Sequence, residues 1–166
     1  MEALLPYDLS PNTLNKYLNN FYFSLKNENI NIIASSKEWI KNSKIYDIVL
    51  IHWPEYLPKL ENQSEEEFLN FTIDRLNYFR KFGKILYFVH NEKPHGTLSK
   101  IQNKLYNSVL SKSDYLFHFS HFSKNLYKNK YKNIQKHFIV PHGNYVELQD
   151  HQIQTAKLLK DFKLDS

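Results

Sequence analysis

A chain of 166 residues with 42% hydrophobic residues has the size of one ordinary domain and can build one continuous core. It contains no cysteine, which excludes a disulfide framework, a thiolate metal site and a cysteine nucleophile. The net charge of +5 comes mostly from lysine, because Arg75 and Arg80 are the only arginines. A lysine surplus attracts anions in general, whereas sequence-specific nucleic-acid recognition relies on arginine, so we expect no nucleic-acid partner.

The sequence carries no signal for insertion into a membrane. No apolar run approaches the ~20 residues that a membrane-spanning helix requires. The first residues, Met1–Tyr7, lack the basic and long apolar segments of a signal peptide. We therefore expect a cytoplasmic protein, with peripheral attachment to the inner face of the membrane as an alternative.

Short β-branched or aromatic runs alternate along the chain with longer segments of helical period. This alternation is typical of βαβ units and predicts an α/β fold, a Rossmann-like parallel sheet of about six strands with helices on both faces. The runs at 48–51 and 85–89 are continuously apolar, as expected of central strands covered on both faces. The predicted strands lie at 3–6, 30–34, 47–53, 84–90, 115–119 and 137–140.

Two of the predicted helices have clear start signals. An apolar stripe at helical spacing runs through residues 14–25, and Ser-Pro-Asn at 10–12 marks its start. The next helix begins with a capping box, in which Glu67 follows Ser64 by three positions, and ends at Gly83. Its inward-facing side chains are expected to be Phe68, Thr72, Leu76 and Phe79.

The remaining helices are predicted from shorter apolar patterns. One includes 101–109, one includes 122–126, and a terminal helix includes 156–162. We expect residues 1–145 to form the Rossmann-like domain and residues 146–166 to be a linker and terminal helix.

Polar clusters follow three predicted strands at the point where each strand ends: His52-Trp53-Pro54-Glu55, then residues 90–95, then residues 141–144. In a parallel sheet, ligands bind outside the carboxyl ends of the strands. Side chains gathered there could position sugar hydroxyls, hold an anionic group, or act as a general acid or base near neutral pH. The clusters bring four histidines and two glutamates to this edge: His52, His90, His95, His142, Glu55 and Glu92.

Two other interpretations of these histidines stay open. In one, the prolines turn the chain and the histidines cap neighbouring loops, which is a structural role. In the other, imidazoles and carboxylates bind zinc or a similar ion, and the protein is a metal-dependent hydrolase. The spacing contains neither an HExxH nor a paired HxH pattern, so no metal cofactor is expected.

Three segments, taken in order, resemble retaining glycosyltransferases of the GT-B fold, in the large family four. They are Tyr46-Asp47-Ile48-Val49-Leu50-Ile51-His52-Trp53-Pro54-Glu55, Val89-His90-Asn91-Glu92-Lys93-Pro94-His95 and Ile139-Val140-Pro141-His142-Gly143-Asn144-Tyr145. The resemblance implies one half of a GT-B fold, the amino-terminal domain that receives the acceptor. It further implies a hexosyltransferase that moves a sugar from a nucleotide-sugar co-substrate to a glycan or lipid-linked acceptor, as in polysaccharide biosynthesis.

The same resemblance assigns roles to individual residues. His90 matches the family's cleft histidine near the transferred sugar and is the candidate catalytic residue. His52, Trp53 and Glu55 would line the acceptor side, with Trp53 stacking on a sugar face. The glycine of the last segment would let the backbone turn and approach the ligand closely. The other candidate substrate-binding residues are Asn91, His95, His142, Gly143 and Asn144.

The chain differs from the family pattern at two places. The loop at 6–12 contains no glycine, whereas the family has a glycine there close to the donor phosphates. The donor-domain Glu-x7-Glu region also has no counterpart, so we expect the donor-binding domain to come from a longer form of the chain or from a partner chain. Because transfer requires both substrates to be held in line, this chain alone is expected to be inactive.

The stretch between Ser120 and His137 contains five lysines and no acid, with three interleaved aromatic residues. A solvated helix face explains most such stretches. Attachment to an anionic membrane, at about 1 kcal/mol per lysine, is the functional alternative. A third class of function is a non-catalytic carbohydrate-binding or scaffold subunit of a split transferase. The stretch consists of Lys124, Lys128, Lys130, Lys132 and Lys136 with Phe122, Tyr127 and Tyr131.

Overall fold

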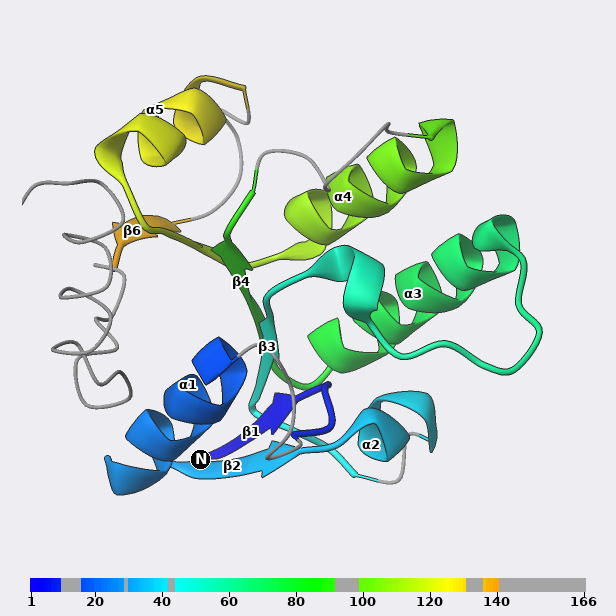
Figure 1. Ribbon diagram of the computed structural model, residues 1–166, viewed down its shortest axis with the longest axis horizontal. Helices are drawn as coiled ribbons and strands as arrows, with labels where there is room; N and C mark the ends of the chain where they lie inside the picture. Colours follow the sequence, from blue (N-terminus) through cyan, green and yellow to red (C-terminus); the bar gives the residue numbers. More distant parts are fainter. Residues whose placement is uncertain (10–15, 29, 42–43, 92–98, 131–135, 141–166) are drawn as a thin grey trace, which may run out of the picture.

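The computed structural model describes residues 1–9, 16–28, 30–41, 44–91, 99–130 and 136–140. Within them, six strands form one parallel sheet in the order β2-β1-β3-β4-β5-β6 (Figure 1). The predicted α/β class and Rossmann-like parallel sheet are therefore confirmed. The strands are β1 (Glu2–Leu5), β2 (Asn31–Ala34), β3 (Ile48–Ile51), β4 (Lys84–Val89), β5 (Tyr115–His118) and β6 (Lys136–Ile139).

Helices cover both faces of the sheet. In the described part of the chain, α1 (Lys16–Asn27) lies alone on one side, and the other helices lie on the opposite side (Figure 1). This division follows from the order of the strands, because the chain moves one way from β1 to β2 and the other way from β3 to β6. The opposite side carries α2 (Ser36–Lys41), α3 (Glu65–Arg80), α4 (Lys100–Lys112) and α5 (His121–Lys130).

The two continuously apolar runs form the middle of the sheet, as predicted. β3 and β4 are neighbours, with Ile51 opposite Tyr87. Val49, Ile51 and Ile85 are almost completely buried. Their side chains fill the space between the two helical layers, so the hydrophobic core is centred on these strands.

Helix α3 has the capping box that its sequence predicts. Ser64 Oγ accepts from the Glu67 backbone N–H at 3.3 Å, and Glu67 Oε2 accepts from the Ser64 N–H at 2.8 Å. Two backbone donors that the helix cannot pair internally are thus satisfied. The four side chains expected to face inward, Phe68, Thr72, Leu76 and Phe79, are all buried.

Gly83 has a second role besides following α3. Its N–H donates to the Phe79 carbonyl at 2.9 Å, which terminates the helix. Its Cα also lies against the chain that enters β3. A Cβ at this position would overlap the Tyr46 carbonyl oxygen and lie 2.6 Å from the Asp47 carbonyl oxygen. Glycine is therefore required here by close approach of two backbone segments.

The sequence prediction missed two short elements. Helix α2 follows β2, and the 3-10 turn η1 (Pro54–Tyr56) follows β3. The start signal at 10–12 and the terminal helix at 156–162 lie outside the described residues, as does the boundary between 1–145 and 146–166. Among the described helices, none combines the length and the apolar character needed to cross a membrane.

Candidate functional site

An open cavity of about 450 Å³ lies at the carboxyl ends of the first three strands. This is where the strand order reverses, between β1 and β3, and such switch points are the usual ligand sites of open parallel sheets. Its walls come from the segments after β1 and β3, from Leu18 of α1 and from the start of α2. The lining residues are Pro6, Tyr7, Asp8, Leu18, Ser36, Trp53, Tyr56 and Pro58.

Tyr7 joins the two strand ends beneath this cavity. Its hydroxyl oxygen accepts from the backbone N–H groups of His52 and Trp53, each at 3.1 Å, and donates to the Trp53 carbonyl at 3.3 Å. Burial raises the pKa of Tyr7, so the phenol stays protonated and able to donate. These bonds fix the backbone that carries the two predicted site residues.

His52 and His90 form a hydrogen-bonded pair at the ends of the two central strands. The distance from His52 Nδ1 to His90 Nε2 is 3.0 Å. His52 is only 1% exposed, whereas His90 is half-buried. The structure thus brings together two of the predicted histidines, but it places His52 beneath His90 instead of on the surface.

Aromatic rings surround this pair. Trp53 stacks on His90 with centroids 4.4 Å apart, and Phe119 lies 4.7 Å from the same ring. From α1, Tyr17 stands edge-on to His90 at 4.7 Å. Trp53 also lines the open cavity, so it connects the cavity with the histidine pair.

Burial holds the pKa of His52 well below its ordinary value, and repulsion from a charged His90 acts in the same direction. His52 is therefore neutral at physiological pH. Its ring stacks on Phe88 at 4.5 Å and meets Phe21 of α1 at 4.6 Å, which explains the strong desolvation.

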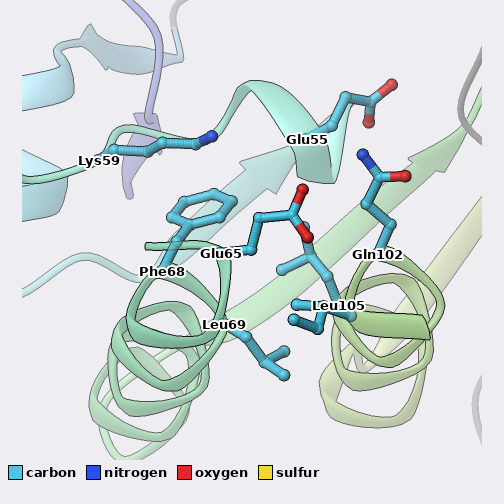
Figure 2. A pocket seen from close by; sticks show the side chains of 8 residues that line it. Glu55, Lys59, Glu65, Phe68, Leu69, Gln102 and Leu105 are labelled. Carbon is cyan, nitrogen blue, oxygen red and sulfur yellow. The ribbon is translucent and has the colours of Figure 1, made fainter. Parts of the chain in front are cut away.

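Glu55 does not join the two histidines. The turn η1 directs it toward α4, where its Oε2 accepts from the Tyr106 hydroxyl at 2.6 Å. There it lines a second, small cavity of about 60 Å³ between η1 and the starts of α3 and α4 (Figure 2). Figure 2 shows the Glu65 carboxylate between Lys59 and Gln102 over an apolar floor that includes Phe68 and Leu69. Trp53 and Glu55, which the sequence places in one cluster at the edge of the sheet, therefore line two different cavities.

Of the remaining candidate residues, Asn91 belongs to the described part of the chain. Asn91 follows β4 directly beside His90. His95, His142, Gly143 and Asn144 lie outside the described residues, together with Glu92. Among the residues whose positions are described, no three histidines, aspartates or glutamates form a group that could hold a metal ion.

Sequence reasoning missed Tyr7, Asp8 and Tyr17. Tyr7 and Asp8 directly follow β1, so the rule that selected the other strand ends could have found them. Asp8 Oδ1 accepts from the Ser36 N–H at 2.9 Å and caps α2. Tyr17 belongs to the apolar stripe of α1, and the stripe pattern does not distinguish it from its neighbours.

A second histidine pair joins the last residue of β5 to the second residue of β6, on the face that α5 covers. His118 Nε2 is 2.9 Å from His137 Nδ1, and His118 Nδ1 is 2.9 Å from Ser123 Oγ. His118 is completely buried, and burial with the neighbouring His137 and Lys124 lowers its pKa to about 4. This pair connects two strands and a helix inside the core.

The lysine stretch is only partly a surface feature. Lys124, Lys128 and Lys130 belong to α5, and Lys136 begins β6. Tyr127 is buried and packs against His118 at 5.6 Å, so it belongs to the core and not to the lysine-bearing surface. Phe122 is 78% exposed, and Tyr131 and Lys132 lie outside the described residues.

The fold and the strand-end cavity define the chain as an α/β protein with a Rossmann-like parallel sheet. Comparisons with protein-family models, with curated proteins and with solved structures give no match.

Proposed function

We propose that this chain is the acceptor-binding half of a GT-B glycosyltransferase and that the acceptor sugar occupies the open cavity at the ends of β1, β2 and β3. The observation that supports this most is the lining of that cavity. Trp53 and Tyr56 offer aromatic faces for the apolar side of a sugar ring. Asp8 and Ser36 offer polar groups for its hydroxyls. The cavity volume of about 450 Å³ is in the range of small-ligand sites.

In this proposal His90 is the catalytic residue. It lies against Trp53, which lines the cavity, at a centroid distance of 4.4 Å. A histidine can accept and release a proton near neutral pH, which suits a group beside a reacting hydroxyl. The donor nucleotide sugar would be held by a separate domain or a partner chain, as the resemblance implies.

Glycan binding should depend on the ring at position 53. We expect Trp53→Ala to weaken the binding of neutral di- and trisaccharides by at least about tenfold, because it removes the stacking surface. Trp53→Phe should retain most of the affinity, since a smaller ring remains. Isothermal titration calorimetry with a panel of such sugars measures both effects.

The matched control is Phe122→Ala on α5. The Phe122 ring is 78% exposed, and Phe122 is not among the residues that line the cavity. This variant should leave glycan affinity unchanged. If the wild-type chain binds no sugar in the panel, or if Trp53→Ala binds as well as wild type, the proposed acceptor site is wrong.

The non-catalytic alternative uses the same cavity. A carbohydrate-binding or scaffold subunit would bind glycan with the same dependence on Trp53. It would, however, never support sugar transfer when mixed with a donor-binding chain and nucleotide sugars. The absence of any transfer by such a complete mixture, together with intact glycan binding, would favour this alternative.

Membrane attachment is a separate proposal that rests on the three lysines of α5. We expect the chain to bind vesicles with 30% anionic lipid at low salt, and the double variant Lys124→Glu, Lys128→Glu to lose most of this binding. Lys26→Glu, Lys81→Glu is the control with the same net charge. Equal loss in both variants, or no binding by wild type in a vesicle sedimentation assay, rules out a specific membrane surface on α5.

A further inference from the structure

The His52–His90 contact is one hydrogen bond between two imidazoles, so its direction has to be assigned. His52 Nδ1 and His90 Nε2 are 3.0 Å apart, and only one of these atoms can carry the shared proton. In the described structure, His52 Nε2 is buried and has no hydrogen-bond partner. Among the described residues, the His52 ring therefore makes its hydrogen bond through Nδ1.

Burial decides which ring carries a positive charge when the pair binds an additional proton. His52 is 1% exposed and enclosed by Tyr17, Phe21 and Phe88. His90 is half-buried. Placing the charge on His90 avoids the cost of an ion in a dry aromatic environment. In that state His90 Nε2 must donate and His52 Nδ1 must accept.

We propose that His52 is a positioning residue, a permanently neutral acceptor that holds its own proton on Nε2 and keeps the proton of His90 on Nε2. His90 is then the member of the pair that gains and loses a proton, and it does so at Nδ1. In this proposal the neutral pair keeps the bond direction of the charged pair, so His90 can exchange its proton without rearrangement of the buried ring. The role resembles that of the buried group behind the histidine of a catalytic triad, with a neutral imidazole in place of a carboxylate.

The groups that face the pair are consistent with a neutral acceptor. α1 contributes the Tyr17 phenol. The segment after β1 contributes the Tyr7 phenol, whose hydroxyl oxygen accepts hydrogen bonds from the backbone N–H groups of residues 52 and 53. Glu55 acts electrostatically on Tyr7, but its carboxylate is bonded to Tyr106. Between the ends of β3 and β4, His52 Nδ1 is therefore the ring nitrogen that faces His90 Nε2.

The test is the protonation state of the two rings in the intact chain labelled with ¹⁵N-histidine. Long-range ¹H–¹⁵N correlation spectra distinguish the two neutral tautomers of an imidazole. Across pH 5.5–8 we expect His52 to show one unchanging tautomer with its proton on Nε2. His90 should titrate, with Nε2 protonated on both sides of its midpoint. A proton on His52 Nδ1 in the neutral pair, or titration of His52 before His90, would overturn the proposal.

Two nearly isosteric variants separate hydrogen bonding from packing. His52→Asn offers an amide oxygen near the position of Nδ1, whereas His52→Leu fills the same space without an acceptor. We expect His52→Leu to move the His90 titration midpoint down by about one pH unit, because the lost hydrogen bond is stronger to the charged than to the neutral imidazole. His52→Asn should restore most of that shift. Equal midpoints in the two variants would contradict the positioning role.

The bond direction in the histidine pair does not depend on the proposed function. Only the catalytic role of His90 rests on it. If the chain binds no glycan but the spectra show the expected tautomers, the acceptor site is wrong and the histidine pair stands. If glycan binding depends on Trp53 but the tautomers are reversed, the pair assignment is wrong and the acceptor site stands.

Discussion

Gly83→Ala is expected to destabilise the protein by about 3 kcal/mol or more, the upper range for overpacking in a closely packed interior. The added Cβ would overlap the Tyr46 carbonyl oxygen and lie 2.6 Å from that of Asp47. Both atoms are backbone, so neither can rotate away as the end of a side chain could. The Lys84 N–H also donates to the Asp47 carbonyl at 2.9 Å, and a shift of that strand entry would break this bond between β3 and β4.

Urea denaturation followed by circular dichroism measures this effect. Phe82→Ala is the control, because Phe82 is the adjacent residue and its side chain is 51% exposed. It should change the free energy of unfolding by only about 1 kcal/mol, because its ring is half exposed and contacts Tyr78 at its edge. A Gly83→Ala variant as stable as Phe82→Ala would show that the two backbone segments are not in close contact.

The second large effect is loss of stability in mild acid, to which the buried His118 contributes. Its pKa is about 4 in the folded protein and near 6.5 in the unfolded chain. As pH falls from 6.5 to 4, the unfolded chain binds a proton that the folded protein does not, so stability falls. Above pH 6.5 this contribution is fully present. The difference between the two pKa values corresponds to a loss of about 3 kcal/mol, and His52 acts in the same direction.

His118→Gln should reduce this dependence, since it removes one of the two buried histidines that cause it. The measurement is the free energy of unfolding in urea at pH 7 and at pH 4 for wild type and variant. His121→Gln, on the exposed first turn of α5, removes one histidine at the surface and should leave the wild-type slope unchanged. If His118→Gln loses as much stability in acid as wild type does, His118 is not the group responsible.

The strands and long helices could be predicted because their signals are local. β3 and β4 are continuous apolar runs. The start of α3 is marked by the capping box of Ser64 and Glu67, three positions apart. Helix α2 also carried a signal of this kind, since Ser35 and Glu38 have capping-box spacing and the Glu38 N–H donates to Ser35 Oγ at 3.2 Å. This signal is weak because the helix has only six residues, and because part of its cap comes from Asp8, which is distant in the sequence.

The candidate site could be predicted only in part. Strand ends locate His52, Trp53 and His90, but the direction of each side chain depends on the backbone beyond the strand. His52 continues the alternation of β3 and points toward α1, whereas the turn at Pro54 carries Glu55 to α4. Two side chains only three positions apart, His52 and Glu55, thus reach opposite sides of the sheet. The burial of His52 depends on Tyr17 and Phe21, and nothing in the local sequence indicates that α1 lies over this strand end.

The parallel order of the sheet also has a consequence for the time course of folding. The five described strand pairs are all parallel, and even the nearest join segments separated by a complete helix. Each pairing must therefore close a long loop before its hydrogen bonds form, which makes such sheets slower to fold than helical bundles. His52 and His90 meet only after α3 has closed the loop between β3 and β4. Until β3 and β4 pair, a folding chain would thus hold both imidazoles in water, each able to bind a proton.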